Sequence, residues 1–104
     1  MNNFMDMVHT GWAGMRFTCV GLDPVYEKIP QCIRAKYPDK KAAIAEFCKE
    51  IVRATCRSAS MYKPNLAFFL AIGTDGLVAL IEVIQFIHEV VPGTPVTLDT
   101  KDMD

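Results

Sequence analysis

Hydrophobic side chains along this chain follow two different spacings, which alternate. Steps of three and four residues predict amphipathic helices over residues 40–59 and 75–90, and a shorter stripe predicts another over residues 2–14. Short runs of β-forming residues predict buried strands over residues 17–22, 61–65 and 95–99. The chain is therefore predicted to alternate between helix and strand from one end to the other.

Prolines and polar residues set the boundaries of these elements. Pro24, Pro30 and Pro38 mark residues 24–38 as a long loop with room for one helical turn. Asp39 follows the last of these prolines and can cap the next helix with its carboxylate. A loop therefore separates the first predicted strand from the helix over residues 40–59.

Two further segments complete the pattern. Pro64 biases Lys63 toward extended backbone and prevents a helix from running through it. Residues 67–70 predict an apolar turn or short helix, and residues 73–76 read as a helix stop followed by a cap. The predicted order is thus helix and strand, repeated three times.

Alternating helices and strands favour an α/β fold with a parallel sheet and helical crossovers. Both a doubly wound sheet and part of a (β/α)8 barrel fit this order, and residues 1–104 are expected to lie within one domain. In either architecture the carboxyl ends of the strands gather on one face, where binding sites are built.

Ionisable residues stand at these predicted strand ends. Asp23 follows the first strand, Lys63 lies in the second, and Asp99 and Lys101 end the third. In an extended chain Asp99 and Lys101 point to the same side, about 6–7 Å apart. Each residue alone also fits a turn or a surface ion pair, but three successive strand ends together indicate a site. Its lysines and carboxylates would keep one another charged, and a lysine could protonate a carbanion.

The composition narrows the alternatives. Hydrophobic residues make up 51% of the chain, and 11 basic and 12 acidic residues leave a formal net charge of −1. Such a balance favours a packed core and argues against nucleic acid as a partner. Residues 1–6 lack the positive charge of a secretion signal, and residues 77–91 are too short and too polar to cross a membrane. A cytoplasmic protein with no membrane partner is therefore expected.

The cysteines and histidines predict no metal site. No C-x-x-C spacing occurs, and His9 and His88 share no ligand spacing. Cys48 and Cys56 are eight residues apart on one predicted helix face, which indicates small apolar core residues in a reduced protein. Neither of the common glycine-rich phosphate-loop motifs is present.

Three motifs together resemble the orotidine 5'-monophosphate decarboxylase family. They are Val20-Gly21-Leu22-Asp23-Pro24, then Tyr62-Lys63-Pro64-Asn65 with Ala67-Phe68-Phe69, and Leu98-Asp99-Thr100-Lys101-Asp102-Met103-Asp104. Their order and spacing are similar to those of the family, from Phe4 onward. The D-x-K-x-x-D pattern is shared by related sugar-phosphate decarboxylases and aldolases, whereas the first two motifs are more specific.

The resemblance implies the first three strands of a (β/α)8 barrel and decarboxylation of orotidine monophosphate to uridine monophosphate, without metal or organic cofactor. Lys101 would protonate C6 of the pyrimidine, and Asp99 would lie beside the substrate carboxyl group. Lys63 would complete the charged network and touch the ribose. Asp23 and Asn65 would contact the ribose hydroxyl groups.

The resemblance also implies a homodimer, because Asp104 would reach into the site of the neighbouring subunit. Asp102 departs from the family pattern, and we expect its carboxylate to point away from the anionic substrate. The chain is also much shorter than the roughly 250 residues of a complete barrel. We therefore expect a fragment or truncated form that is inactive alone, which a turnover assay on the 104 residues would test.

Two other functions stay open at this point. The chain could belong to a related sugar-phosphate enzyme that uses Mg²⁺, and binding of 6-azauridine monophosphate would separate that from the decarboxylase. It could also form a self-standing, non-catalytic α/β module that binds a partner, which a cooperative melt and a stable monomer would support.

Overall fold

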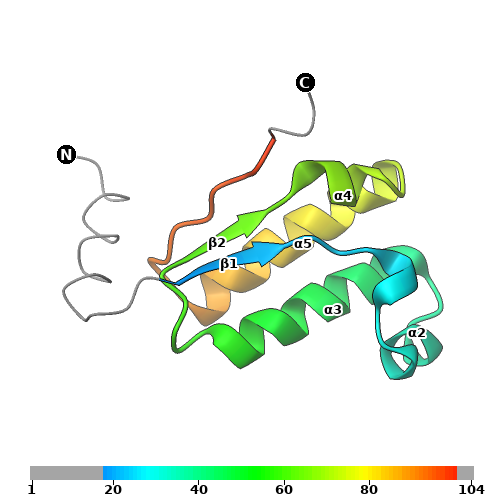
Figure 1. The fold of residues 1–104 in the computed structure, drawn as a ribbon, viewed down its shortest axis with the longest axis horizontal. Helices are drawn as coiled ribbons and strands as arrows, with labels where there is room; N and C mark the ends of the chain where they lie inside the picture. Colours follow the sequence, from blue (N-terminus) through cyan, green and yellow to red (C-terminus); the bar gives the residue numbers. More distant parts are fainter. Residues whose placement is uncertain (1–17, 101–104) are drawn as a thin grey trace.

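The computed structural model describes residues 18–100, which form two parallel strands, four α-helices and a 3-10 turn (Figure 1). The elements in chain order are β1 (Cys19–Leu22), η1 (Tyr26–Lys28), α2 (Gln31–Lys36), α3 (Lys40–Thr55), β2 (Met61–Pro64), α4 (Leu66–Leu70) and α5 (Thr74–Val90). The predicted helix over residues 2–14 lies outside the described residues. An α/β fold with a parallel sheet is confirmed within them.

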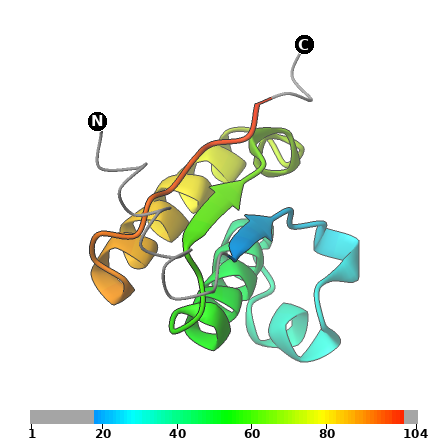
Figure 2. The ribbon, with the colours of Figure 1, turned by 60° about the vertical axis from the view of Figure 1, so that its left-hand side comes forward.

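The long helices cover one face of the sheet. β1 and β2 pair in parallel, with Gly21 opposite Lys63. In Figure 1 α5 passes behind the strands and α3, which packs against α5, runs below them, and Figure 2 shows both helices on the same side of the strands. Leu22 and Tyr62 are buried against this helical layer, whereas Gly21 is exposed. Alternate strand residues therefore face either the core or an open sheet face, as the period of two requires.

The predicted strand over residues 95–99 is wrong as a regular strand. This segment runs parallel to β2 but pairs with it only at two isolated bridges, Tyr62 with Val96 and Asn65 with Asp99. The backbone N–H of Tyr62 donates to Pro95, at 3.0 Å, and the N–H of Thr97 donates to Tyr62, at 2.9 Å.

Pro64 explains the gap between the two bridges. A continuous parallel ladder would next need a backbone N–H at position 64, and proline has none. Pairing resumes just beyond it, where the Asp99 N–H donates to the Pro64 carbonyl at 2.8 Å. The segment therefore keeps the register of a strand but not its continuous hydrogen bonding.

Leu98 corrects a second expectation about this segment. Val96 packs against the core as predicted, but Leu98, which we expected to be buried, is 41% exposed. The hydrophobic pattern marks which residues can be buried, and burial itself depends on what packs next to them.

The helices largely follow the predicted spacing, with shifted ends. The helix predicted over residues 40–59 ends at Thr55, and the N–H groups of Ser58 and Ala59 both donate to the Thr55 carbonyl in the turn that follows. Asp39 takes the predicted N-cap position, but its side chain makes no capping hydrogen bond. The loop over residues 24–38 contains more helix than expected, namely η1 and the six-residue α2.

The core lies between the sheet and the two long helices. Tyr62 and Phe69 are its largest fully buried side chains, and the Tyr62 hydroxyl forms a hydrogen bond with Thr55 Oγ1 at 2.8 Å. Cys48 is fully buried, as expected, whereas Cys56 is only partly buried, because it lies just beyond the end of α3. All four cysteines are free thiols.

Gly76 allows α4 and the start of α5 to pack closely. A Cβ atom at this position would lie 1.6 Å from the Phe69 carbonyl oxygen and 2.6 Å from its carbon. Gly73 precedes α5 with a φ of 84°, a left-handed conformation that favours glycine. The tight turn from α4 into α5 therefore depends on both glycines, for different reasons.

Candidate active site at the strand ends

Asp23, Lys63 and Asp99 lie near the carboxyl ends of three adjacent parallel segments. Asn65 is paired with Asp99, and Lys63 is paired with Gly21, two residues before Asp23. Asp23, Asn65 and Asp99 therefore lie side by side at the same height along the three parallel segments. Lys63 lies two residues before Asn65, which places it on the same face and nearer the amino ends of the strands. Neighbouring strands are about 4.8 Å apart, so these side chains share a small area.

The open sheet face carries these groups. The Asp23 carboxylate lies over the position of Gly21, because a Cβ built there would be 3.8 Å from Asp23 Oδ1. Gly21 is aligned with Lys63, and paired residues of parallel strands point to the same face. Asp23 is exposed, and Lys63 and Asp99 are partly buried. The cluster can therefore be reached from solvent while its backbone is held by the sheet.

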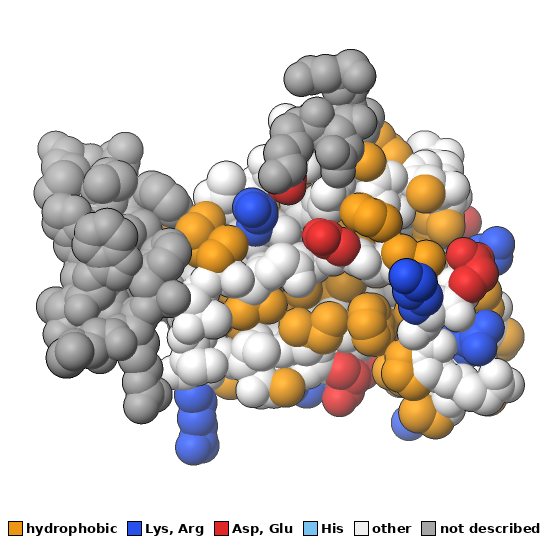
Figure 3. Space-filling model, in the orientation of Figure 1, with side chains coloured by type: hydrophobic (Ala, Val, Ile, Leu, Met, Phe, Trp, Pro, Cys, Tyr) orange, Lys and Arg blue, Asp and Glu red, His pale blue; other side chains and the backbone are white. Residues whose placement is uncertain are grey.

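The view from this side shows the same arrangement. In Figure 3, basic and acidic side chains lie near one another over the carboxyl ends of the strands, with hydrophobic side chains around them. Opposite charges at such a site attract one another and can hold a ligand that has both anionic and hydrogen-bonding groups.

Asn65 has a role in this structure that its sequence motif did not reveal. Its side chain is almost fully buried, with 4% exposure, and its Oδ1 atom accepts a hydrogen bond from the Ala67 N–H at 3.0 Å. Asn65 is therefore the N-cap of α4. The signal was available, since asparagine before a short apolar helix is a favoured cap.

Lys101, Asp102 and Asp104 lie outside the described residues. The roles that the family resemblance implies for them stay predictions. Asp99, two residues before Lys101, is held by its bridge to Asn65.

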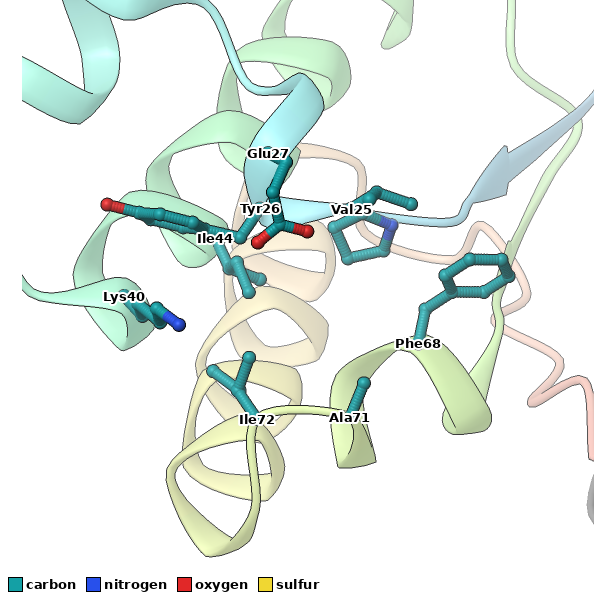
Figure 4. A pocket seen from close by; sticks show the side chains of 9 residues that line it. Val25, Tyr26, Glu27, Lys40, Ile44, Phe68, Ala71 and Ile72 are labelled. Carbon is teal, nitrogen blue, oxygen red and sulfur yellow. The ribbon is translucent and has the colours of Figure 1, made fainter.

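A cavity of about 290 Å³ lies behind the loop that follows β1. Figure 4 shows side chains from this loop, α3, α4 and the turn into α5 around it. Its lining is mainly apolar, and Glu27 and Lys40 contribute the charged groups. Pro24, which directly follows Asp23 in the chain, is one of the residues that line this cavity. Sequence patterns did not indicate the cavity, because its walls come from separate segments.

Two absences apply to residues 18–100. No group of three or more His, Cys, Asp or Glu side chains in this part of the chain could hold a metal ion. Within the same range, no helix is long and apolar enough to cross a membrane.

Cys48 is on α3, in the hydrophobic core, and the charge of Asp23 affects the pKa of its thiol. Burial raises the pKa of the Cys48 thiol to about 12, and the Asp23 carboxylate adds to this shift. The thiol ordinarily titrates near 9.0, so the folded protein holds the proton more tightly than the unfolded chain. This contribution to stability is present below pH 9 and is lost as the pH rises toward 12.

We therefore expect the free energy of unfolding to fall between pH 9 and 12 by more in the wild type than in Cys48→Ala. Urea unfolding at several pH values measures how the free energy of unfolding of each protein changes with pH. The cavity that alanine leaves lowers this free energy by the same amount at every pH, so it does not change the slope. Equal slopes would show that the Cys48 proton does not contribute.

Comparison with curated proteins finds several orotidine 5'-phosphate decarboxylases as relatives. An orotidine 5'-phosphate decarboxylase from Leptospira interrogans is 38% identical over 86 residues, which cover 83% of this chain and 30% of the relative. Those from Roseiflexus castenholzii and Dechloromonas aromatica are 36% and 41% identical over 104 and 103 residues. These two matches cover 100% and 97% of this chain, and 35% and 36% of the relatives. No family model matches the sequence.

Solved structures give the same result. The OMP decarboxylase of Leishmania donovani matches with a TM-score of 0.68 and 38% identity, over 94% of this chain and 33% of that one. A structure from Toxoplasma gondii described as a putative orotidine-monophosphate-decarboxylase matches with a TM-score of 0.73 and 35% identity, over 94% and 30%. The resemblance drawn from the three motifs is confirmed, and the chain spans about a third of the length of the curated relatives it matches.

Proposed function

We propose that this chain is part of an orotidine 5'-phosphate decarboxylase and supplies the charged half of its active site. By the complete enzyme we mean a protein of the same length as these relatives that contains the residues of this chain. In it, the described strands would be successive strands of a (β/α)8 barrel. The observation that carries the proposal is the level arrangement of Asp23, Asn65 and Asp99 above Lys63. Its support is the 34–41% identity to curated decarboxylases.

The proposed reaction replaces a carboxylate on C6 of the pyrimidine by a proton. The bond between C6 and the carboxyl carbon breaks, CO₂ leaves, and the electron pair stays on C6. The Lys101 ammonium then donates its proton to C6. A lysine suits this step because neighbouring carboxylates keep it charged until the carbanion forms.

Asp99 and Lys63 would hold Lys101 in a network of alternating charge. Asp99 is two residues from Lys101, so in extended backbone both side chains point to the same face. Its carboxylate would lie beside the substrate carboxylate and favour departure of that group. Lys63 would balance the negative charge on the sheet face and reach the ribose.

The remaining roles concern binding and assembly. Asp23 is exposed at the mouth of the site and would accept hydrogen bonds from ribose hydroxyl groups. The family resemblance also implies a ribose contact for Asn65, whose side chain caps α4 in this structure. Asp104 would complete the site of a second subunit, which makes a homodimer the active form of the complete enzyme.

Turnover of orotidine 5'-monophosphate by the complete enzyme tests the proposal. We expect conversion to uridine 5'-monophosphate that is unchanged by EDTA, and tight binding of 6-azauridine monophosphate. Turnover of a sugar phosphate that requires Mg²⁺, without turnover of orotidine monophosphate, would instead support the related sugar-phosphate enzymes.

A further inference from the structure

We propose that Asn65 is a positioning residue, which holds Asp99 in place by capping α4. This inference rests on the proposed function of the strand ends. It goes further by assigning the side chain of Asn65 to the protein framework rather than to the ribose.

The first step concerns how Asp99 is attached to β2. The segment that carries Asp99 is bridged to β2 near Tyr62 and again at Asn65. Pro64 lies between these bridges and has no N–H to donate, so the ladder is interrupted there. The position of Asp99 therefore depends on the second bridge, and the first, three residues away, constrains it less.

The second step concerns what makes that bridge. The Asp99 N–H donates to the Pro64 carbonyl at 2.8 Å, and the Leu66 N–H donates to the Asp99 carbonyl at 3.0 Å. Leu66 is the first residue of α4. The second of these two backbone hydrogen bonds is thus donated by the first turn of a helix only five residues long.

The third step concerns what fixes that first turn. Asn65 Oδ1 accepts the Ala67 N–H at 3.0 Å, and the Asn65 carbonyl accepts the Phe68 N–H at 3.2 Å. The Asn65 N–H donates to the Leu22 carbonyl at 3.0 Å, which ties the same residue to β1. Short helices have few internal hydrogen bonds, so a cap is a large share of what orders them.

These contacts link one buried side chain to the geometry of the site. Loss of the cap would leave the Ala67 N–H without its acceptor and loosen the turn that includes Leu66. Asp99 would then be held less firmly beside Lys101. Misplacement of a reacting group by about 1 Å can cost roughly a hundredfold in rate.

The test compares Asn65→Ala, Asn65→Ser and the wild type in the complete enzyme. Serine caps a helix about as well as asparagine but lacks its amide group. We expect Asn65→Ala to lower kcat by roughly tenfold to a hundredfold, with KM and the Kd of uridine monophosphate changed by less than about threefold. Asn65→Ser is expected to recover most of the lost kcat.

The matched control is Asp39→Ala, because Asp39 is also at an N-cap position but its side chain caps nothing. It should leave kcat and KM unchanged. Equal losses of uridine monophosphate affinity in Asn65→Ala and Asn65→Ser would show an amide contact with the ribose and overturn the proposal. A lower melting temperature with unchanged kcat in Asn65→Ala would also overturn it. Absence of turnover in the wild type would contradict the proposed function itself.

Discussion

Replacement of Lys101 by alanine in the complete enzyme is expected to lower kcat for orotidine monophosphate by roughly 10²- to 10⁴-fold, the range that a positioned general acid contributes. The reason is that the proposed step needs a proton at C6, which the proposal assigns to Lys101, whereas it assigns Lys63 to the ribose and the charge balance. Binding of uridine monophosphate should change by less than about tenfold, since the proposed role of Lys101 is in the chemical step rather than in binding. Single-turnover kinetics and a titration with uridine monophosphate measure the two effects separately.

Arg57→Ala is a suitable control for the loss of one positive charge. Arg57 is exposed in the turn between α3 and β2, and so precedes the amino end of β2 rather than following its carboxyl end. The Arg57→Ala variant should leave both kcat and the affinity for uridine monophosphate unchanged. A Lys101→Ala enzyme that kept near-normal kcat would exclude Lys101 as the proton donor, while wild-type turnover would still support the proposed function.

The second large effect concerns stability. Gly76→Ala is expected to destabilise the fold by about 3 kcal/mol or more, at the upper end of what overpacking costs. The added Cβ would lie 1.6 Å from the Phe69 carbonyl oxygen, which belongs to the backbone and cannot rotate away. Alanine would otherwise favour helix α5 by about 1 kcal/mol, so the clash has to outweigh this gain. Urea unfolding of the complete enzyme measures the difference.

Gly21→Ala adds the same atom in a different environment. Among residues 18–100, its Cβ would meet only Asp23 Oδ1, at 3.8 Å, which is an ordinary contact. We expect a change in unfolding free energy of less than about 1 kcal/mol. Equal stability of the Gly76→Ala variant and the wild type would mean that α4 and α5 do not pack as closely as described here.

Much of the fold could be predicted from residue spacing. The helical repeat over residues 75–90 corresponds to α5, and the run before Asp23 corresponds to β1. These predictions succeeded because period and propensity are local properties, which each segment carries wherever it packs. The short helix α2 was missed because it spans only six residues between prolines, too few for a period to be visible.

The site was predictable in part. A parallel sheet brings strand ends together, so Asp23, Lys63 and Asp99 could be placed on one face from their positions alone. The cap made by Asn65 and the interrupted pairing of residues 95–99 with β2 were not anticipated. Both depend on which backbone groups find partners, and a single proline at position 64 changed that pairing.

The sequence by itself therefore determined the order of helices and strands, the parallel arrangement and the candidate charged residues, because these follow from periodicity and from residue type. Only the tertiary structure decided that Leu98 is exposed, that Gly76 must remain small and that Asn65 joins α4 to the segment of Asp99. The physical reason is that burial, close approach and hydrogen-bond pairing are relations between segments far apart in the chain. Such relations exist only once those segments have packed.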